Sequence, residues 1–237
     1  MTADFAFPRL TQEKLARSRK AYVDDWLVPL WSKLDWHNVH EFVFWHAIAG
    51  WARGGNAAAD HALTFGRAGE IAALGTRSRE LWSGIPKAIP SLARGHANPL
   101  TLLSTPDVLA ALAGFDEVRH IGPKIAAFTL RDLSFLRDVR DGGPGWFEGL
   151  PEVWQAAFMP IDRYVYAALL EAEASPTAAS AADITEVQSD RDTHCAVGLE
   201  LVRWARQLSF DPRDVNVFWF SYGAEDVDEE GRPTPDE

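Results

Sequence analysis

A sharp turn between two expected helices, at residues 115–133, constrains this chain more than any other segment. It reads Phe-Asp-Glu-Val-Arg-His-Ile-Gly-Pro-Lys-Ile-Ala-Ala-Phe-Thr-Leu-Arg-Asp-Leu. Pro123 suits the first turn of a helix, where its missing N–H has no intrahelical partner. Backbone N–H groups at a helix start beside a glycine turn form a ready phosphate-binding site. Lys124 lies in this first turn although the helix dipole disfavours a cation there, so it is the residue to explain.

The rest of the chain is also patterned as helices, because apolar residues recur at helical spacing. We expect helices over residues 10–34, 39–49, 56–65, 78–91, 108–113, 124–139, 150–158, 162–172, 192–208 and 211–219. Residues 174–183, rich in alanine and serine, are expected to form a mobile linker. The sequence shows neither a convincing alternating strand pattern nor a repeat. The prediction is an all-α chain.

Composition bounds the class of protein. The 237 residues are enough to bury a core, and 47% of them are hydrophobic. No apolar run approaches the roughly 20 residues that span a membrane, and residues 1–5 lack a signal pattern. A single cysteine, Cys195, excludes an internal disulfide and a four-cysteine iron–sulfur or zinc site. We expect a cytoplasmic, nucleoid-associated protein.

The net charge of −11 by itself argues against binding of nucleic acid. The distribution of the charge along the chain weakens this objection. Residues 224–237 carry seven acids and one arginine, and residues 171–192 carry six acids and one arginine. The remainder is close to neutral. Because the acids are concentrated in segments expected to be flexible, we expect modest, salt-sensitive DNA binding.

The turn resembles the hairpin of the helix-hairpin-helix (HhH-GPD) DNA glycosylase superfamily. That family's pattern is roughly Leu-Pro-Gly-Val-Gly-x-Lys-x-Ala, and residues 118–126 read Val-Arg-His-Ile-Gly-Pro-Lys-Ile-Ala. The second glycine, the branched residue before it, the lysine and the following alanine all match, whereas a histidine replaces the first glycine. The resemblance implies that the hairpin binds DNA through His120, Ile121, Gly122 and Pro123.

A second motif of the same family follows in the right order. In that family a Gly/Pro-containing loop leads to an aspartate heading another helix, in a Pro-Val-Asp-x-His pattern. Residues 141–146 read Asp-Gly-Gly-Pro-Gly-Trp, and residues 159–165 read Met-Pro-Ile-Asp-Arg-Tyr-Val. Asp162 matches the family aspartate, and Tyr164 stands where histidine is common. The 38-residue spacing from Lys124 to Asp162 implies an insertion around residues 141–158.

The resemblance, whose specific part is residues 118–165, implies a two-lobed helical fold with the active site between the lobes. We expect a single glycosylase-like domain at 1–223, with lobe one at 1–50 and 163–223, and lobe two at 51–162. Residues 224–237 are expected to be an acidic flexible tail.

The two motifs carry the groups that cleavage of an N-glycosidic bond needs. Bond cleavage builds positive charge on the deoxyribose, and a carboxylate below C1′ stabilises it. Asp162 is the candidate, and a helix N-terminus favours its ionised form. A neutral lysine amine attacks C1′ to form a Schiff base, provided that burial lowers its pKa. Lys124 is the candidate, and the target base is first rotated out of the duplex.

Members of this family that carry the lysine are bifunctional: they remove the base as glycosylases and cleave the strand as lyases. The resemblance therefore implies a base-excision repair DNA N-glycosylase with DNA-(apurinic or apyrimidinic site) lyase activity. Relatives with this lysine and no cluster commonly remove oxidised purines such as 8-oxoguanine; oxidised pyrimidines are the second choice. The expected partner is double-stranded DNA with a damaged base, bound by a monomer without a cofactor.

Two other functions compete with this one. The chain is alternatively a non-catalytic helix-hairpin-helix module that binds DNA or protein, or a glycosylase fold acting on a free nucleoside or modified nucleobase. Lys124 is then a phosphate contact or a solvated residue, and Asp162 a simple N-cap.

Other residues of interest have ordinary structural explanations. Most tryptophans are expected in the core, and four near element ends are candidates for the base pocket: Trp36, Trp51, Trp146 and Trp219. No metal site is expected, because His37, His40 and His46 lack a third ligand with suitable spacing. The charges of Arg131-Asp132 and of residues 137–140 are expected on a solvated helix face.

Overall fold

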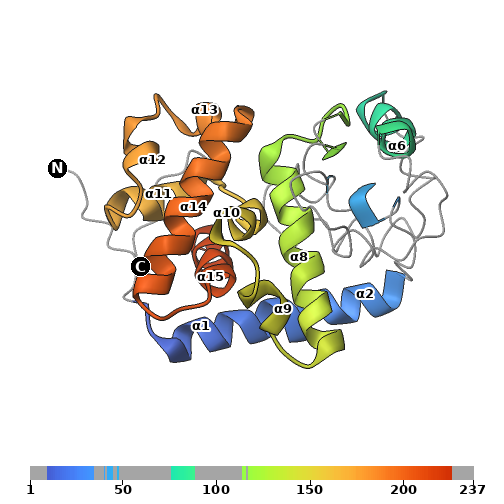
Figure 1. Ribbon diagram of the computed structural model, residues 1–237. Coiled ribbons are helices and arrows are strands. Elements are labelled where there is room, and N and C mark those ends of the chain that lie inside the picture. The colour runs from blue at the N-terminus through green and yellow to red at the C-terminus, as the bar shows by residue number, and fades with distance from the viewer. Residues whose placement is uncertain are drawn as a thin grey trace.

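The computed structural model describes residues 10–34, 40, 42–44, 47, 76–88, 114–115 and 117–225. Every regular element in this part is a helix, which confirms the all-α prediction there (Figure 1). None of these helices is long and apolar enough to cross a membrane. The helices expected over 56–65 and 108–113 lie outside the described residues, as do most of 39–49 and residues 226–237 of the expected tail.

The first helix runs unbroken in three parts, α1 (Gln12–Arg19), the π-helical η1 (Lys20–Leu27) and α2 (Val28–Leu34). Thr11 caps its start by accepting a hydrogen bond from the Lys14 N–H at 3.2 Å. The widened middle part closes with the Val28 N–H bonded to the Val23 carbonyl, five residues back. Pro29 follows directly; its ring would clash with a carbonyl in a regular α-helical turn, and the wider turn accommodates it.

Helix α8 (Pro123–Asp141) is the buried centre of the described structure. Figure 1 shows it in the middle of the molecule, between α6 (Thr76–Ala88) and the C-terminal helices, with the first helix crossing its lower end. The expectation of a solvated face at Arg131-Asp132 is wrong, because both side chains are fully buried. They are neutralised by each other, with Arg131 Nη2 lying 3.0 Å from Asp132 Oδ1.

The chain after α8 forms a compact set of helices around its C-terminal pair. In order they are α9 (Gly145–Glu148), α10 (Glu152–Gln155), the 3₁₀-helix η3 (Ala156–Phe158), α11 (Arg163–Glu171), α12 (Pro176–Ser180), α13 (Ile184–Ser189), α14 (Arg191–Gln207) and α15 (Pro212–Glu225). Helix α15 contacts α1, α11 and α14. The mobile linker expected at 174–183 is instead partly helical: Ser175 caps α12 and accepts a bond from the Ala178 N–H at 3.0 Å.

An ionic cluster joins the first helix, α8 and α15. Asp138 on α8 lies 3.1 Å from Arg19 and 2.9 Å from the buried Arg213, and Arg19 also lies 3.0 Å from Asp214. Burial and the neighbouring carboxylate of Asp211 raise the pKa of Asp214 to about 6. Charged groups from the first helix, α8 and the start of α15 thus meet in one buried or partly buried cluster, an arrangement that is costly to disrupt by removing one partner.

Gly198 lets α14 approach η3 more closely than any other residue would. A Cβ added at Gly198 would lie 2.8 Å from the Ala156 carbonyl oxygen and 3.5 Å from the Met159 Cβ. Both neighbours belong to the segment that leads to Asp162. The absence of a side chain at Gly198 therefore sets the depth at which this segment lies against α14.

This contact predicts opposite outcomes for one substitution at two helical glycines. Gly198→Ala should lower the free energy of unfolding by about 1–3 kcal/mol, because the backbone at Ala156 must shift. Gly84→Ala in α6 is the control: its added Cβ meets only Val118 Cγ1, at an ordinary 3.8 Å. It should raise stability by about 0.5–1 kcal/mol through helix propensity. Urea denaturation of both variants measures this, and equal effects would contradict it.

Candidate active site

The hairpin before α8 has the geometry that the sequence indicates. Gly122 is the N-cap of α8 with an extended backbone, and Pro123 occupies the first helical position. The Ile121 N–H bonds to the Val118 carbonyl at 3.0 Å, which closes the turn. His120 has a left-handed backbone with φ of 76°. Glycine suits this conformation best, and a histidine adopts it more readily than most other residues.

Helix α6 holds the hairpin through one carboxylate. Glu80 Oε2 lies 2.8 Å from His120 Nε2, and Glu80 Oε1 lies 2.9 Å from Arg119 Nη1. The His120 hydrogen bond, assisted by the charge of Arg119, lowers the pKa of Glu80. The His120 ring is thus engaged with α6, and the turn is stabilised from outside its own sequence.

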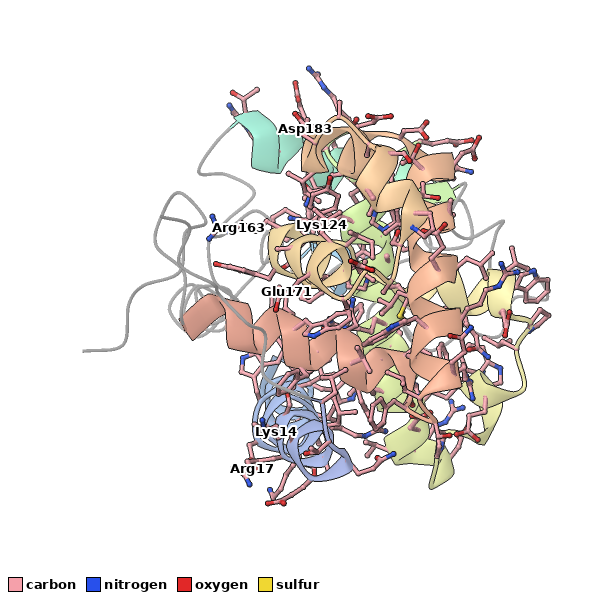
Figure 2. All side chains as sticks on the ribbon, turned by 90° about the vertical axis from the view of Figure 1, so that its left-hand side faces the viewer. Lys14, Arg17, Lys124, Arg163, Glu171 and Asp183 are labelled. Carbon is pink, nitrogen blue, oxygen red and sulfur yellow. The ribbon has the colours of Figure 1, made fainter. Side chains whose placement is uncertain are left out.

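Lys124 lies half-buried at the start of α8, close to the start of α11 (Figure 2). Burial lowers the pKa of its amine. The carboxylate of Asp162 opposes this shift, and the guanidinium of Arg163 adds to it. The neutral amine is therefore more accessible here than for a lysine in water, which is the condition for nucleophilic attack.

Asp162 caps α11 and lies almost entirely out of solvent, with 8% exposed. Its Oδ1 accepts hydrogen bonds from the backbone N–H groups of Tyr164 at 3.0 Å and Val165 at 2.8 Å. Burial raises the pKa of Asp162, while these N–H groups and the charge of Lys124 oppose the rise. The structural role of an N-cap is thus present, and the same carboxyl also interacts with the lysine.

The charges of Lys124 and Asp162 therefore interact in a poorly solvated place, although 38 residues separate the two in sequence. Burial disfavours both charges, so the pKa of the acid rises and that of the amine falls. The energy needed to convert the charged pair to a neutral one is reduced from both sides. A pair of this kind can supply either a carboxylate or a neutral amine to a bound substrate.

A stacked pair from the first turn of α11 borders this site. Arg163 donates a hydrogen bond to the Tyr164 hydroxyl, and its guanidinium carbon lies 4.6 Å from the centre of that ring. Figure 2 shows Arg163 and Lys124 in the same part of the molecule. Both side chains are half-buried, so a cation and a phenol lie next to the lysine–aspartate pair.

Sequence reasoning missed His194, a buried histidine on α14. Its Nδ1 lies 3.2 Å from the Val187 carbonyl oxygen and its Nε2 lies 3.1 Å from that of Met159. Burial, together with a smaller effect of the Lys124 charge, lowers the pKa of His194 to about 4. Its position in the first turn of a long helix gave no signal, because the groups that its ring contacts lie in other segments.

The structure brings none of the described tryptophan candidates to the lysine. Trp219 is 2% exposed and packs on Trp204 with ring centres 5.3 Å apart, so it is a core residue. Trp146 lies under the Arg137 guanidinium at 4.4 Å, and Arg137 is 13 residues, or about 20 Å along a helix, from Lys124. Trp36 and Trp51 lie outside the described residues.

Within the described residues, no group of three or more histidine, cysteine, aspartate or glutamate side chains is placed to hold a metal ion. His40 instead lies against α6, with its ring stacked on Trp82 at 3.7 Å. The chain matches no protein-family model, no curated protein and no solved structure.

Proposed function

We propose that this protein is a base-excision DNA glycosylase of the helix-hairpin-helix superfamily with an associated AP lyase activity. The observation that carries the proposal is the electrostatic interaction of the half-buried Lys124, which directly follows a glycine hairpin, with the buried carboxyl group of Asp162. The proposed substrate is double-stranded DNA with a damaged base, an oxidised purine such as 8-oxoguanine first and an oxidised pyrimidine second. The two-lobed arrangement of the superfamily is part of the same proposal.

The proposed reaction uses each partner once. The neutral Lys124 amine attacks C1′ of the extruded nucleotide, and the C1′–N bond breaks with its electron pair leaving on the base, which takes up a proton. Ionised Asp162 stabilises the positive charge on the sugar. Loss of the amine protons and opening of the sugar ring give the imine. Removal of a C2′ proton then expels the 3′ phosphate, which breaks the strand.

One observation favours a different substrate. Helix α13 contacts the start of α8, and a Cβ added at Gly122 would lie 3.5 Å from the Gln188 carbonyl. The exposed acids Asp183, Glu186 and Asp190 belong to α13 or to its ends. Negative charge so near the hairpin weakens its attraction for a phosphate backbone. The second candidate is therefore an enzyme with a glycosylase fold that acts on a free nucleoside or a modified nucleobase.

Borohydride trapping separates these candidates. The protein is incubated with duplexes that each carry one lesion, and in parallel with the corresponding free nucleosides. A covalent protein–DNA adduct supports the glycosylase/lyase, and the lesion panel identifies the base. Base release from nucleosides without any adduct on duplex DNA would support the second candidate. Duplex binding with neither reaction would support the non-catalytic module.

Lys124→Gln should abolish the trapped adduct and strand cleavage, because an amide cannot form the imine. Binding of lesion duplex should fall only slightly, since one side chain among many phosphate contacts contributes little to affinity. Lys124→Arg should not restore activity, because the guanidinium stays protonated. A gel of the borohydride-treated reaction measures this. Lys20→Gln is the control, because Lys20 is exposed on η1 and pairs with Asp25. An adduct that persists in Lys124→Gln would assign the chemistry to another amine.

Asp162→Asn should separate catalysis from capping. Asparagine caps a helix about as well as aspartate, so the free energy of unfolding should change by less than about 1 kcal/mol. The single-turnover rate of base release should fall at least about 100-fold, the scale of removing one positioned catalytic group. Asp183→Asn, at the exposed N-cap of α13, is the matched control and should keep the rate. Unchanged base release in Asp162→Asn would reduce that residue to a cap.

Gly122→Val should weaken binding of undamaged and lesion duplex by the same factor, about 5- to 10-fold, because phosphate contacts carry no base identity. The backbone of Gly122 has φ of −95°, which any residue adopts, and the added Cβ meets only ordinary contact. The fold should therefore persist. Gly145→Val, where an added Cβ meets nothing within 4 Å, is the control. Fluorescence anisotropy measures both affinities, and a loss confined to lesion DNA would contradict the assignment.

A further inference from the structure

The four residues before α11, Met159 to Asp162, form a buried, non-helical segment between η3 and α11. Met159 has φ of −104° and ψ of 91°, and Asp162 is also extended. All four residues are buried. A buried carbonyl outside a helix must find a partner elsewhere, because an unpaired one costs about as much as a lost hydrogen bond.

Side chains from three different helices face the three carbonyls that precede Asp162. Gln188 Nε2 of α13 donates to the Ile161 carbonyl at 3.1 Å, and Asn216 Nδ2 of α15 donates to that of Pro160 at 3.0 Å. His194 Nε2 of α14 lies 3.1 Å from the Met159 carbonyl oxygen. The segment is thus held along its whole length by long-range contacts.

The Asn216 contact extends back to the helix that carries Lys124. Asn216 Oδ1 accepts a hydrogen bond from Arg131 Nη1 at 2.8 Å, and both residues are fully buried. Arg131 is seven residues, or two turns, after Lys124 on α8. Its own position is fixed by Asp132 and by the Tyr22 hydroxyl, 2.6 Å from Nη2. A continuous chain of bonds therefore joins α8 to the Pro160 carbonyl.

We propose that Gln188, His194 and Asn216 are positioning residues that fix Asp162 against Lys124. Asp162 is held rigidly on α11 by its own capping bonds. The three side chains determine where this helix start lies relative to α8. The inference rests on the proposed function for its chemistry, although the placement itself can be tested without any substrate.

Gln188 and Asn216 are the better residues to change. A neutral imidazole has a single N–H, so His194 donates to only one of the two carbonyls that it faces. The side-chain amide of Asn216 has a single possible orientation, because its oxygen must accept from Arg131 and its nitrogen must donate to the Pro160 carbonyl. Gln188 is also half-buried, so its variant should fold even if Asn216→Leu does not.

The experiment measures the titration of Lys124 directly. The chain contains five lysines, so reductive methylation with ¹³C-formaldehyde gives few signals, and the Lys124 signal is the one absent from Lys124→Gln. Asp162 raises the pKa of Lys124, so loss of the pairing must lower it. Asp162→Asn removes the negative charge itself and therefore gives the largest decrease in the pKa of Lys124. Gln188→Met and Asn216→Leu should each lower the pKa of Lys124 by at least about 0.5, part of the shift that a nearby opposite charge produces.

Gln155→Met is the matched control. Gln155 is buried, donates to the carbonyls of Phe147, Glu148 and Leu150, and accepts a bond from Arg206, so it makes the same kinds of bond away from the site. Its variant should lose stability while Lys124 titrates as in the wild type. A role in stability alone predicts that Gln155→Met and Gln188→Met behave alike, and that result overturns the proposal.

Single-turnover kinetics give the second measurement. Gln188→Met and Asn216→Leu should slow base release about 10- to 100-fold, the cost of a displacement of about 1 Å, with the Kd for lesion duplex within about twofold. An unchanged Lys124 titration in both variants, with a shift in Asp162→Asn, would overturn the positioning role. A wild-type protein that releases no base would count against the proposed function alone, because the titration needs no substrate.

Discussion

The buried guanidinium of Arg131 is the interaction on which the described structure depends most. A charged group without solvent is tolerated only when paired and hydrogen-bonded, and Arg131 meets this condition with groups from three segments. Asp132 is its neighbour on α8, Tyr22 comes from η1 and Asn216 from α15. The aromatic rings of Tyr22 and Phe128 also lie 4.8 Å and 5.0 Å from the guanidinium carbon. The first helix and α15 must therefore meet α8 at this level.

The site inherits its geometry from this centre. Helix α8 carries the half-buried Lys124 at its start and the fully buried Arg131 in its middle, while the Asn216 bridge reaches the segment before Asp162. The charge of Arg131 also opposes the rise in the pKa of Asp162. Two cations on one helix, the half-buried Lys124 and the buried Arg131, thus act on the same carboxylate and favour its ionised form despite its burial.

A surface that only binds phosphate needs positive charge, but both positive and negative side chains lie around this hairpin. The cation Lys124 belongs to the site and Arg163 lies beside it, while the acids of α13 belong to a helix that contacts α8. Opposite charges so close together restrict the surface on which a phosphate backbone is attracted. For the proposed glycosylase this arrangement favours contact at the hairpin and α11 over broad contact with the duplex.

The sequence by itself determined the local structure: the helical periodicity, the Gly-Pro start of α8, the aspartate cap of α11 and the identity of Lys124 and Asp162 as the residues to explain. These features depend on a few neighbouring residues, so they are legible in a linear pattern. Only the tertiary structure decided that Arg131 and Asp132 are buried, that Trp219 belongs to the core, and that Gln188, His194 and Asn216 hold the segment before Asp162. Burial and long-range hydrogen bonds depend on which helices meet, and helical spacing places a charge on a face without saying whether that face is covered.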